Sequence, residues 1–240
     1  MLDGMSIKQK MEYDAKTNKT VGFVDLGAGS VEDVEAKEAL VVMLVGLKAN
    51  WKCAIAYYFT KGLSSEQQTE LVKHCLDACH EANLRVCSLT MDGHSTNKGM
   101  AKLLGCRLKL ASSFCPSFDY NGHKIHLYFD ACHMVKLVRN TLEAYSVIVG
   151  PSGRIVWQFI KDLHTTQEDI GLRLGNKLTP DHIDFKNKKM KVKLAVQVLS
   201  SSVASALEFL QSTGMYSFSN AGPTVEFIRV IHFICHEACE

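Results

Sequence analysis

Residues 85–93, RVCSLTMDG, decide the fold of this chain, because they form an apolar, strand-like run that ends at a carboxylate, Asp92. Two other strand-like runs also carry an aspartate. LDGMSIK, residues 2–8, contains Asp3, and KIHLYFD, residues 124–130, ends at Asp130. Neighbouring strands bring such carboxylates together, and close carboxylates stay ionised only when a cation neutralises them. The pattern favours a divalent-metal site, although three unrelated aspartates at strand ends remain the alternative on spacing alone.

The segments around Asp92 alternate between strand and helix. Ser64 and Gln67 have the spacing of a capping box, which predicts a helix from Ser64 to about Asn83 with an apolar stripe of Leu71, Val72, Cys75 and Cys79. A hairpin of residues 2–14 and 20–27 and an acidic helix over 30–38 are predicted to come first. The other predicted elements are strands 39–47, 52–60 and 123–129 and helices 95–104 and 131–145.

This order predicts an α/β fold that begins antiparallel and becomes parallel in its second half. It matches a ribonuclease H-like (RNase H-like) mixed sheet with helices, in which the strand of Asp3 and the strand of Asp92 are neighbours. A second, mostly helical unit is predicted over 141–213, after the core of residues 1–140.

The predicted helical unit contains the densest basic run of the chain, KNKKMKVK at residues 186–193. A single long helix is predicted over 191–211, with its apolar side chains facing inward. No GxxxxGK[ST] or GxGxxG loop occurs, so the sequence pattern itself does not predict a nucleotide site.

Composition limits the class of protein. The 240 residues are 47% hydrophobic and 22% charged with a net charge of +2, which is globular and does not by itself indicate a nucleic-acid binder. Nine cysteines, an odd number, favour a reducing compartment. No apolar run reaches transmembrane length, and no membrane partner is expected. Both ends read as cut, so a fragment of a longer protein is expected.

Two His/Cys-rich segments, HCLDACH from His74 and HFICHEAC from His232, are compatible with a zinc site. Their spacings match no common short-range zinc motif. Cys75 and Cys79 also fall on the apolar stripe, so core cysteines are the favoured interpretation.

Five ordered motifs resemble one family, the P element transposases and their vertebrate relatives, the THAP-domain transposase-like proteins. The motifs are DGMSIKQKMEYD from Asp3 with GFVDLG, MDGHSTN, LYFDACHMVKLVRN, the long segment from Lys189, and AGPTVEFI from Ala221. The resemblance implies an RNase H-like catalytic core interrupted by a GTP-binding insertion. It places the core at 1–140, the insertion at 141–213, and the return to the core with a truncated final helix at 214–240. It also implies nuclear action on DNA at transposon ends, and homo-oligomers formed through regions outside this chain.

Carried onto this sequence, the resemblance implies that Asp3 and Asp92 are the first two acidic catalytic residues and metal ligands, holding Mg²⁺ or Mn²⁺. Glu226 is the candidate for the third, because Gly222-Pro223 stands where relatives carry an acidic residue. The GTP cofactor would be bound by Lys136, Asn140 and Lys191. The alternative function is an inactive remnant of such a core that acts at most as a nucleic-acid or protein binding module.

Overall fold

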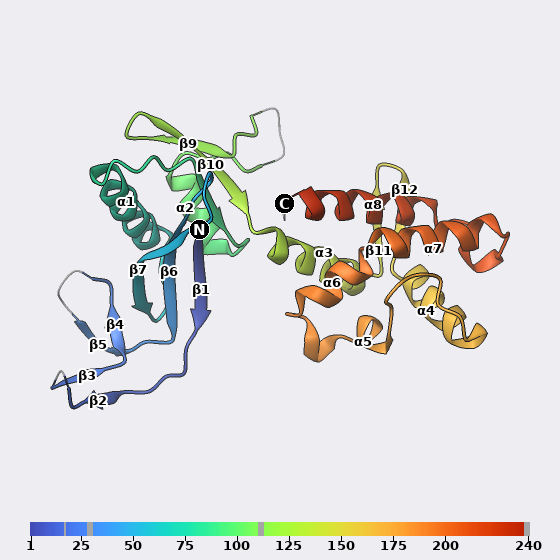
Figure 1. Cartoon of the computed structure of the whole chain (residues 1–240), viewed down its shortest axis with the longest axis horizontal. Coiled ribbons are helices and arrows are strands. Elements are labelled where there is room, and N and C mark those ends of the chain that lie inside the picture. Colours follow the sequence, from blue (N-terminus) through green and yellow to red (C-terminus); the bar gives the residue numbers. More distant parts are fainter. Residues whose placement is uncertain (17, 28–30, 110–112, 238–240) are drawn as a thin grey trace. The chain divides into compact units, whose positions relative to one another are not determined.

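The computed structural model describes residues 1–16, 18–27, 31–109 and 113–237. It divides into two compact units, unit 1 from Met1 to Asp130 and unit 2 from Ala131 to Glu240, and each is described by itself (Figure 1).

Unit 1 is built on two sheets whose strands come from its whole length. The first has the order β1-β6-β7-β4-β5 with antiparallel neighbours, and the second has the order β8-β10-β9. A separate hairpin joins β2 and β3. The predicted hairpin of residues 2–14 with 20–27 is otherwise wrong, because β1 pairs with β6, and β4 pairs with β5 and β7. The strands are β1 (Leu2–Ser6), β2 (Glu12–Asp14), β3 (Lys19–Val21), β4 (Phe23–Asp25), β5 (Val31–Glu35), β6 (Glu38–Val45), β7 (Lys52–Thr60), β8 (Ser88–Met91), β9 (Ser117–Tyr120) and β10 (His123–Phe129).

The edge strands β1 and β8 contact each other, so the two sheets adjoin at this line. β8 pairs in parallel with β10, whereas β1, β6 and β7 run antiparallel (Figure 1). The predicted change from antiparallel to parallel pairing is confirmed. It occurs between β1, which carries Asp3, and β8, which Asp92 follows.

Two helices, α1 (Ser65–Glu81) and α2 (Ser95–Leu103), cover one face of these sheets. The predicted capping box is present: Ser64 Oγ accepts from Gln67 N–H, and Gln67 Oε1 accepts from Ser64 N–H. The helices and sheets share one apolar core, which includes Leu2, Leu40, Val42, Val72, Cys75, Leu76, Leu89, Met91, Met100, Ile125 and Leu127.

The predicted acidic helix over 30–38 is wrong, because the chain there forms strand β5, which pairs antiparallel with β4. Its sequence VEDVE does not alternate apolar and polar residues, so local periodicity does not mark it as a strand. Its pairing with β4 outweighs the local acidic signal. Residues 28–30 lie outside the described part of the chain.

Unit 2 is mostly helical with one two-stranded sheet, β11 (Val147–Gly150) and β12 (Gly153–Val156). Its core joins all the longer helices around Leu142, Trp157, Ile160, Val198 and Leu207, each at most 1% exposed. The helical elements are α3 (Ala131–Tyr145), α4 (Gln158–Ile170), α5 (Pro180–Ile183), η1 (Lys186–Lys188), α6 (Val192–Val198), α7 (Ser201–Ser212), η2 (Tyr216–Phe218) and α8 (Gly222–Glu237).

The single helix predicted over 191–211 is wrong, because it is two helices, α6 and α7, separated at Leu199 and Ser200. Ser200 is extended (φ −93°, ψ 156°), and its Oγ donates to the carbonyl of Gln197 at 2.8 Å. Such local side-chain bonds compete with the helical pattern, and three consecutive serines from Ser200 supply them.

Within the described residues, Val192–Ser212 is the stretch long and apolar enough to cross a membrane by length and composition, with a mean hydropathy of 1.2. Its side chains at Val198, Val203, Ala204 and Leu207 are fully buried in the core of unit 2. Core packing therefore accounts for these four apolar side chains.

The last helix, α8, packs on α7, α3 and β12 inside unit 2. Thr224, fully buried in its first turn, accepts a hydrogen bond from Val156 N at 3.0 Å. The boundaries predicted at 140/141 and 213/214 stay predictions, and the edge between the compact units lies at 130/131.

Candidate active site around Asp92

Asp92 lies in the turn that leads from β8 into α2, and its carboxylate is held by that turn. Oδ1 accepts from the backbone N–H of His94 at 2.8 Å and from Nδ2 of Asn97 at 2.7 Å. His94 is the N-cap of α2, and its Nδ1 accepts from Thr96 N at 3.4 Å. The sequence thus places a half-buried, oriented carboxylate at the C-terminal end of β8.

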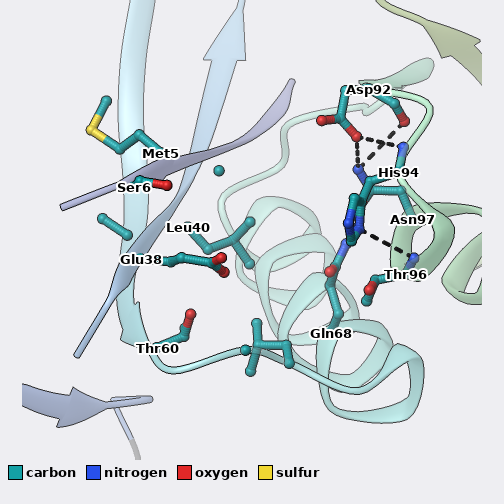
Figure 2. Close-up of a pocket in the computed structure, with 14 residues that line it drawn as sticks. Met5, Ser6, Glu38, Leu40, Thr60, Gln68, Asp92, His94, Thr96 and Asn97 are labelled. Carbon is teal, nitrogen blue, oxygen red and sulfur yellow. Dashed lines mark hydrogen bonds between the residues drawn. The ribbon is translucent and has the colours of Figure 1, made fainter. Parts of the chain in front are cut away.

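Asn97 is itself held by a residue that the sequence did not single out. Its Oδ1 accepts a hydrogen bond from Nε2 of Gln68, which lies on α1 and is 4% exposed (Figure 2). Nε2 also lies 3.4 Å from Sδ of Met100. A signal was present: Gln68 precedes Val72 by four residues and Cys75 by seven, so it is a polar side chain on the buried stripe of α1.

Asp92 and Asn97 face a cavity of about 240 Å³ whose opposite wall comes from the first sheet (Figure 2). That wall includes Glu38, a carboxylate that the sequence prediction did not include among the ligands. The cavity is lined by Gly4, Met5, Ser6, Glu38, Ala39, Leu40, Thr60, Gly62, Leu63, Gln68, Asp92, His94, Thr96 and Asn97.

Asp3 lies on β1 opposite Val41, and its side chain is exposed while that of Leu2 is buried. β1, which carries Asp3, contacts β8, and Asp92 directly follows β8. Asp3 itself is not part of the cavity lining, although the residues that follow it on β1 are. Asp130 lines a different cavity of about 570 Å³, together with Ser88 and Thr90.

Glu226, the predicted third ligand, is exposed and lies on α8 in unit 2. It lines a cavity of about 200 Å³ formed by the β11–β12 turn, Pro223, Phe227 and Val230. Across residues 1–16, 18–27, 31–109 and 113–237, no three His, Cys, Asp or Glu side chains gather closely enough to hold a metal ion. Asp3, Asp92 and Glu226 as a ligand set therefore stay a prediction.

The predicted nucleotide residues lie on two contacting helices of unit 2. Lys136 and Asn140 are half-buried on α3, and Lys191 is exposed at the N-cap of α6. Nε and Nη2 of Arg139 donate to Oδ1 of Asn140 at 3.1 and 2.8 Å, and Nη2 also donates to the carbonyl of Lys189 at 2.7 Å. Arg139 thus fastens the basic segment beside Asn140.

Acidic side chains lie near the cations of this region: Asp181 pairs with Lys188, and Glu143 interacts electrostatically with Arg139. Lys188 pairs with Asp181 at 2.5 Å, and this ammonium group lowers the pKa of the Asp181 carboxyl. Arg139 is fully buried, and desolvation lowers its pKa below the usual value of an arginine. The other lysines of the 186–193 run are mostly exposed.

The cysteine prediction is confirmed where it can be followed. Cys75 and Cys79 are 7% and 5% exposed and belong to the core of unit 1, and burial raises the pKa of the Cys79 thiol. Cys239, the last residue of the alternative zinc segment, lies outside the described residues.

Two family models match the chain. Residues 1–105 match the RNase H N-terminal domain of TNP-like proteins, and residues 132–237 match the TNP-like GTP-binding insertion domain. The predicted RNase H-like fold with an inserted domain is thereby confirmed.

Curated relatives and a solved structure agree with these models. The chain is 29% identical to the human DNA transposase THAP9 over 97% of its length, and 25% identical to the Drosophila melanogaster transposable element P transposase over 78%. It covers 26% and 24% of those proteins, about a quarter of each. It also superposes on a chain of the Drosophila P element transposase strand transfer complex with a TM-score of 0.77 at 22% identity, covering 96% of this chain and 48% of that one.

Proposed function

We propose that this chain, which belongs to the family of P element-like transposases, is part of a DNA transposase core that uses a divalent metal and GTP. In this proposal unit 1 contributes metal ligands at the ends of β1 and β8. Unit 2 binds GTP, and the whole protein acts in the nucleus on transposon ends, as a homo-oligomer formed through regions outside this chain. The observation that carries the proposal is the oriented carboxylate of Asp92 on the strand that contacts the strand of Asp3.

The donor set fits magnesium or manganese in part. Carboxylate oxygens are the ligands these hard cations prefer, and both hydrogen bonds to Asp92 end on Oδ1, which directs Oδ2 to another partner. Asp3 supplies a second exposed carboxylate from the adjoining strand. When bound, a metal pair would activate an attacking hydroxyl and stabilise the leaving oxygen of the phosphodiester.

Residues of this chain hold the proposed metal ligand and a proposed phosphate contact in place. Asp92 is fixed before any metal arrives, so little reorientation is required on binding. His94, at the N-cap of α2, lies on the same cavity as Asp92, where it can contact a backbone phosphate. Glu226 remains our candidate for the third carboxylate, contributed from α8.

GTP binding is supported by the insertion-domain match and by the arrangement of α3 and α6. Two bonds to Oδ1 of Asn140 fix its amide with the Nδ2 donor on the other side. Lys136 and Lys191 lie on the same two helices and can neutralise phosphate charge. We propose a site between α3 and the start of α6 that prefers GTP over ATP.

Equilibrium binding of fluorescent GTP, with ATP as competitor, tests the nucleotide site. We expect Lys191→Ala and Lys136→Ala to weaken GTP binding, and Lys161→Ala, an exposed lysine on α4, to leave it unchanged. Equal affinity for both nucleotides, or none for either, would refute the proposal.

A second candidate function is a binding module without catalytic activity. The observation that favours it is that Glu226 lines a largely apolar cavity with Phe227 and Val230. Loss of one coordinating carboxylate weakens a cation site and leaves charge on the leaving oxygen less stabilised.

Nicking of a plasmid that carries family-type transposon ends separates the two functions. We expect this chain alone to show no robust nicking with magnesium or manganese. Robust metal-dependent nicking, abolished by Asp92→Ala and by Glu226→Gln, would mean that Glu226 suffices as the third ligand and that the chain is an enzyme by itself.

A further inference from the structure

We propose that Gln68 and Asn97 are positioning residues that set the orientation of Asp92 for a divalent cation. This inference rests on the proposed role of Asp92 as a metal ligand and extends it to two residues that touch no metal themselves. The chain of contacts runs from Nε2 of Gln68 to Oδ1 of Asn97, and from Nδ2 of Asn97 to Oδ1 of Asp92 at 2.7 Å.

The donor and acceptor roles in these hydrogen bonds are fixed by the negative charge of the Asp92 carboxylate. An ionised carboxylate only accepts hydrogen bonds, so Asn97 must turn its NH₂ group toward Asp92. Its carbonyl oxygen then faces Gln68, which must present its own NH₂ group. Gln68 therefore holds Asn97 in the one amide orientation that supports an ionised Asp92.

Two features keep Gln68 in place. It is 4% exposed, and its Nε2 also contacts Sδ of Met100 at 3.4 Å, so both protons of that nitrogen have a neighbour. The helices α1 and α2 approach closely where Ser65 Oγ donates to the carbonyl of Thr96 at 3.1 Å. A Cβ on Gly99 would lie 2.1 Å from Ser65 Oγ, so glycine is what permits this approach.

As a consequence, the two carboxylate oxygens of Asp92 have different partners. Oδ1 accepts two hydrogen bonds, from His94 N–H and from Asn97, which fixes the plane of the carboxylate. Oδ2 takes no hydrogen bond from any residue in the described ranges, so it is the oxygen available to a cation. Partners of a metal ligand that lie outside the coordination sphere typically change metal affinity by about 10- to 100-fold when removed.

The test measures binding of Mn²⁺ to the 240-residue chain by electron paramagnetic resonance of the free ion, without DNA. Gln68→Met and Asn97→Leu remove the polar groups while keeping size and charge. We expect each to weaken Mn²⁺ binding about tenfold. We expect Gln68→Met to have no further effect when Asp92→Asn is already present, because it acts only through Asp92.

The matched control is Gln67→Met, next to Gln68 on the same helix. It breaks the capping box with Ser64 and lowers stability, but it does not touch Asn97 or Asp92. Its Mn²⁺ affinity should equal that of the unmodified chain. Urea unfolding of every variant shows whether a loss of affinity comes from a loss of structure.

The outcomes separate this inference from the proposed function. If Asp92→Asn weakens Mn²⁺ binding but well-folded Gln68→Met and Asn97→Leu do not, the positioning role is wrong and the metal site stands. If Asp92→Asn has no effect, or the unmodified chain binds no Mn²⁺, the metal site of the proposed function is wrong and the positioning role fails with it. If Gln68→Met weakens binding equally with and without Asp92→Asn, Gln68 acts by another route and the inference is overturned.

Discussion

Arg139 offers a sharp test of how unit 2 is held together, because a charged side chain lies wholly inside it. Its guanidinium carbon lies 3.9 Å from the ring centroid of Phe185, and its Nε and Nη2 donate to Asn140 and to the Lys189 carbonyl. Its Nη1 is buried with no hydrogen-bond partner among the described residues. Some of its contacts therefore stabilise the unit while the buried charge opposes them.

The change in the free energy of unfolding on substitution of Arg139 follows from these opposing contributions. Hydrogen bonds from a charged donor are worth about 1.5–3 kcal/mol each, and a desolvated cation–π contact about 2 kcal/mol. Burial of the ion costs several kcal/mol in the opposite direction. Arg139→Met keeps most of the side-chain volume and removes both the favourable contacts and the buried charge. We therefore expect it to lower the free energy of unfolding by about 1–3 kcal/mol.

Arg139→Ala should cost more, because it also removes buried methylenes worth about 0.8 kcal/mol each and leaves a cavity. We expect a total of about 3–5 kcal/mol. Arg139→Lys should resemble the methionine variant rather than the unmodified chain, since an ammonium cannot reproduce the planar fork that reaches both acceptors.

Tryptophan fluorescence during urea unfolding is the assay, because Trp157 is 1% exposed and packs edge-on against Phe185 at 5.9 Å between centroids. The other tryptophan, Trp51, lies in unit 1 and is replaced in a Trp51→Phe background. The reasoning would be refuted if Arg139→Met and Arg139→Ala lowered the free energy of unfolding equally, or if Arg139→Met were more stable than the parent.

Three smaller predictions concern unit 1. Ser64→Ala removes the N-cap and should lower the unfolding free energy of unit 1 by about 1 kcal/mol in urea denaturation followed by circular dichroism; no loss would mean that the cap is not formed in solution. Hydrogen bonding by Ser117 lowers the pKa of the Cys115 thiol, so its alkylation should reach half-maximal rate at a lower pH than an ordinary thiol, and Ser117→Ala should move that midpoint up; an unchanged profile contradicts the assigned cause. Gly99→Ala would press a methyl group against Ser65 and should lower the melting temperature, whereas a neutral result would show that the helices can separate at little cost.

Local signals predicted the regular elements well. The capping box at Ser64 correctly placed the start of α1, and the predicted ranges 52–60 and 131–145 are those of β7 and α3. Each of these depends on residues within a few positions of one another, which periodicity and capping rules capture.

The helix predicted over 30–38 and the single helix predicted over 191–211 were both wrong because of competing interactions that periodicity does not resolve. Strand β5 is stabilised by its pairing with β4, an interaction between segments rather than within one. The break between α6 and α7 arises from Ser200, where a side-chain bond to Gln197 replaces the helical pattern inside an otherwise continuous apolar period.

In the candidate site, too, the residues set by local sequence were predictable and the residue set by tertiary packing was not. Asp92 was predictable, because its role depends on ending a strand, and Asn97 lies only five residues further on. Gln68 was not, because it reaches the site through the packing of α1 against α2, 29 residues away in sequence. A polar residue on a buried helical stripe must find a partner, so its presence indicated a hidden contact without naming it. Which partner it finds is decided by tertiary packing. Asp92 therefore has its chemistry from the strand it ends and its orientation from a helix that precedes that strand.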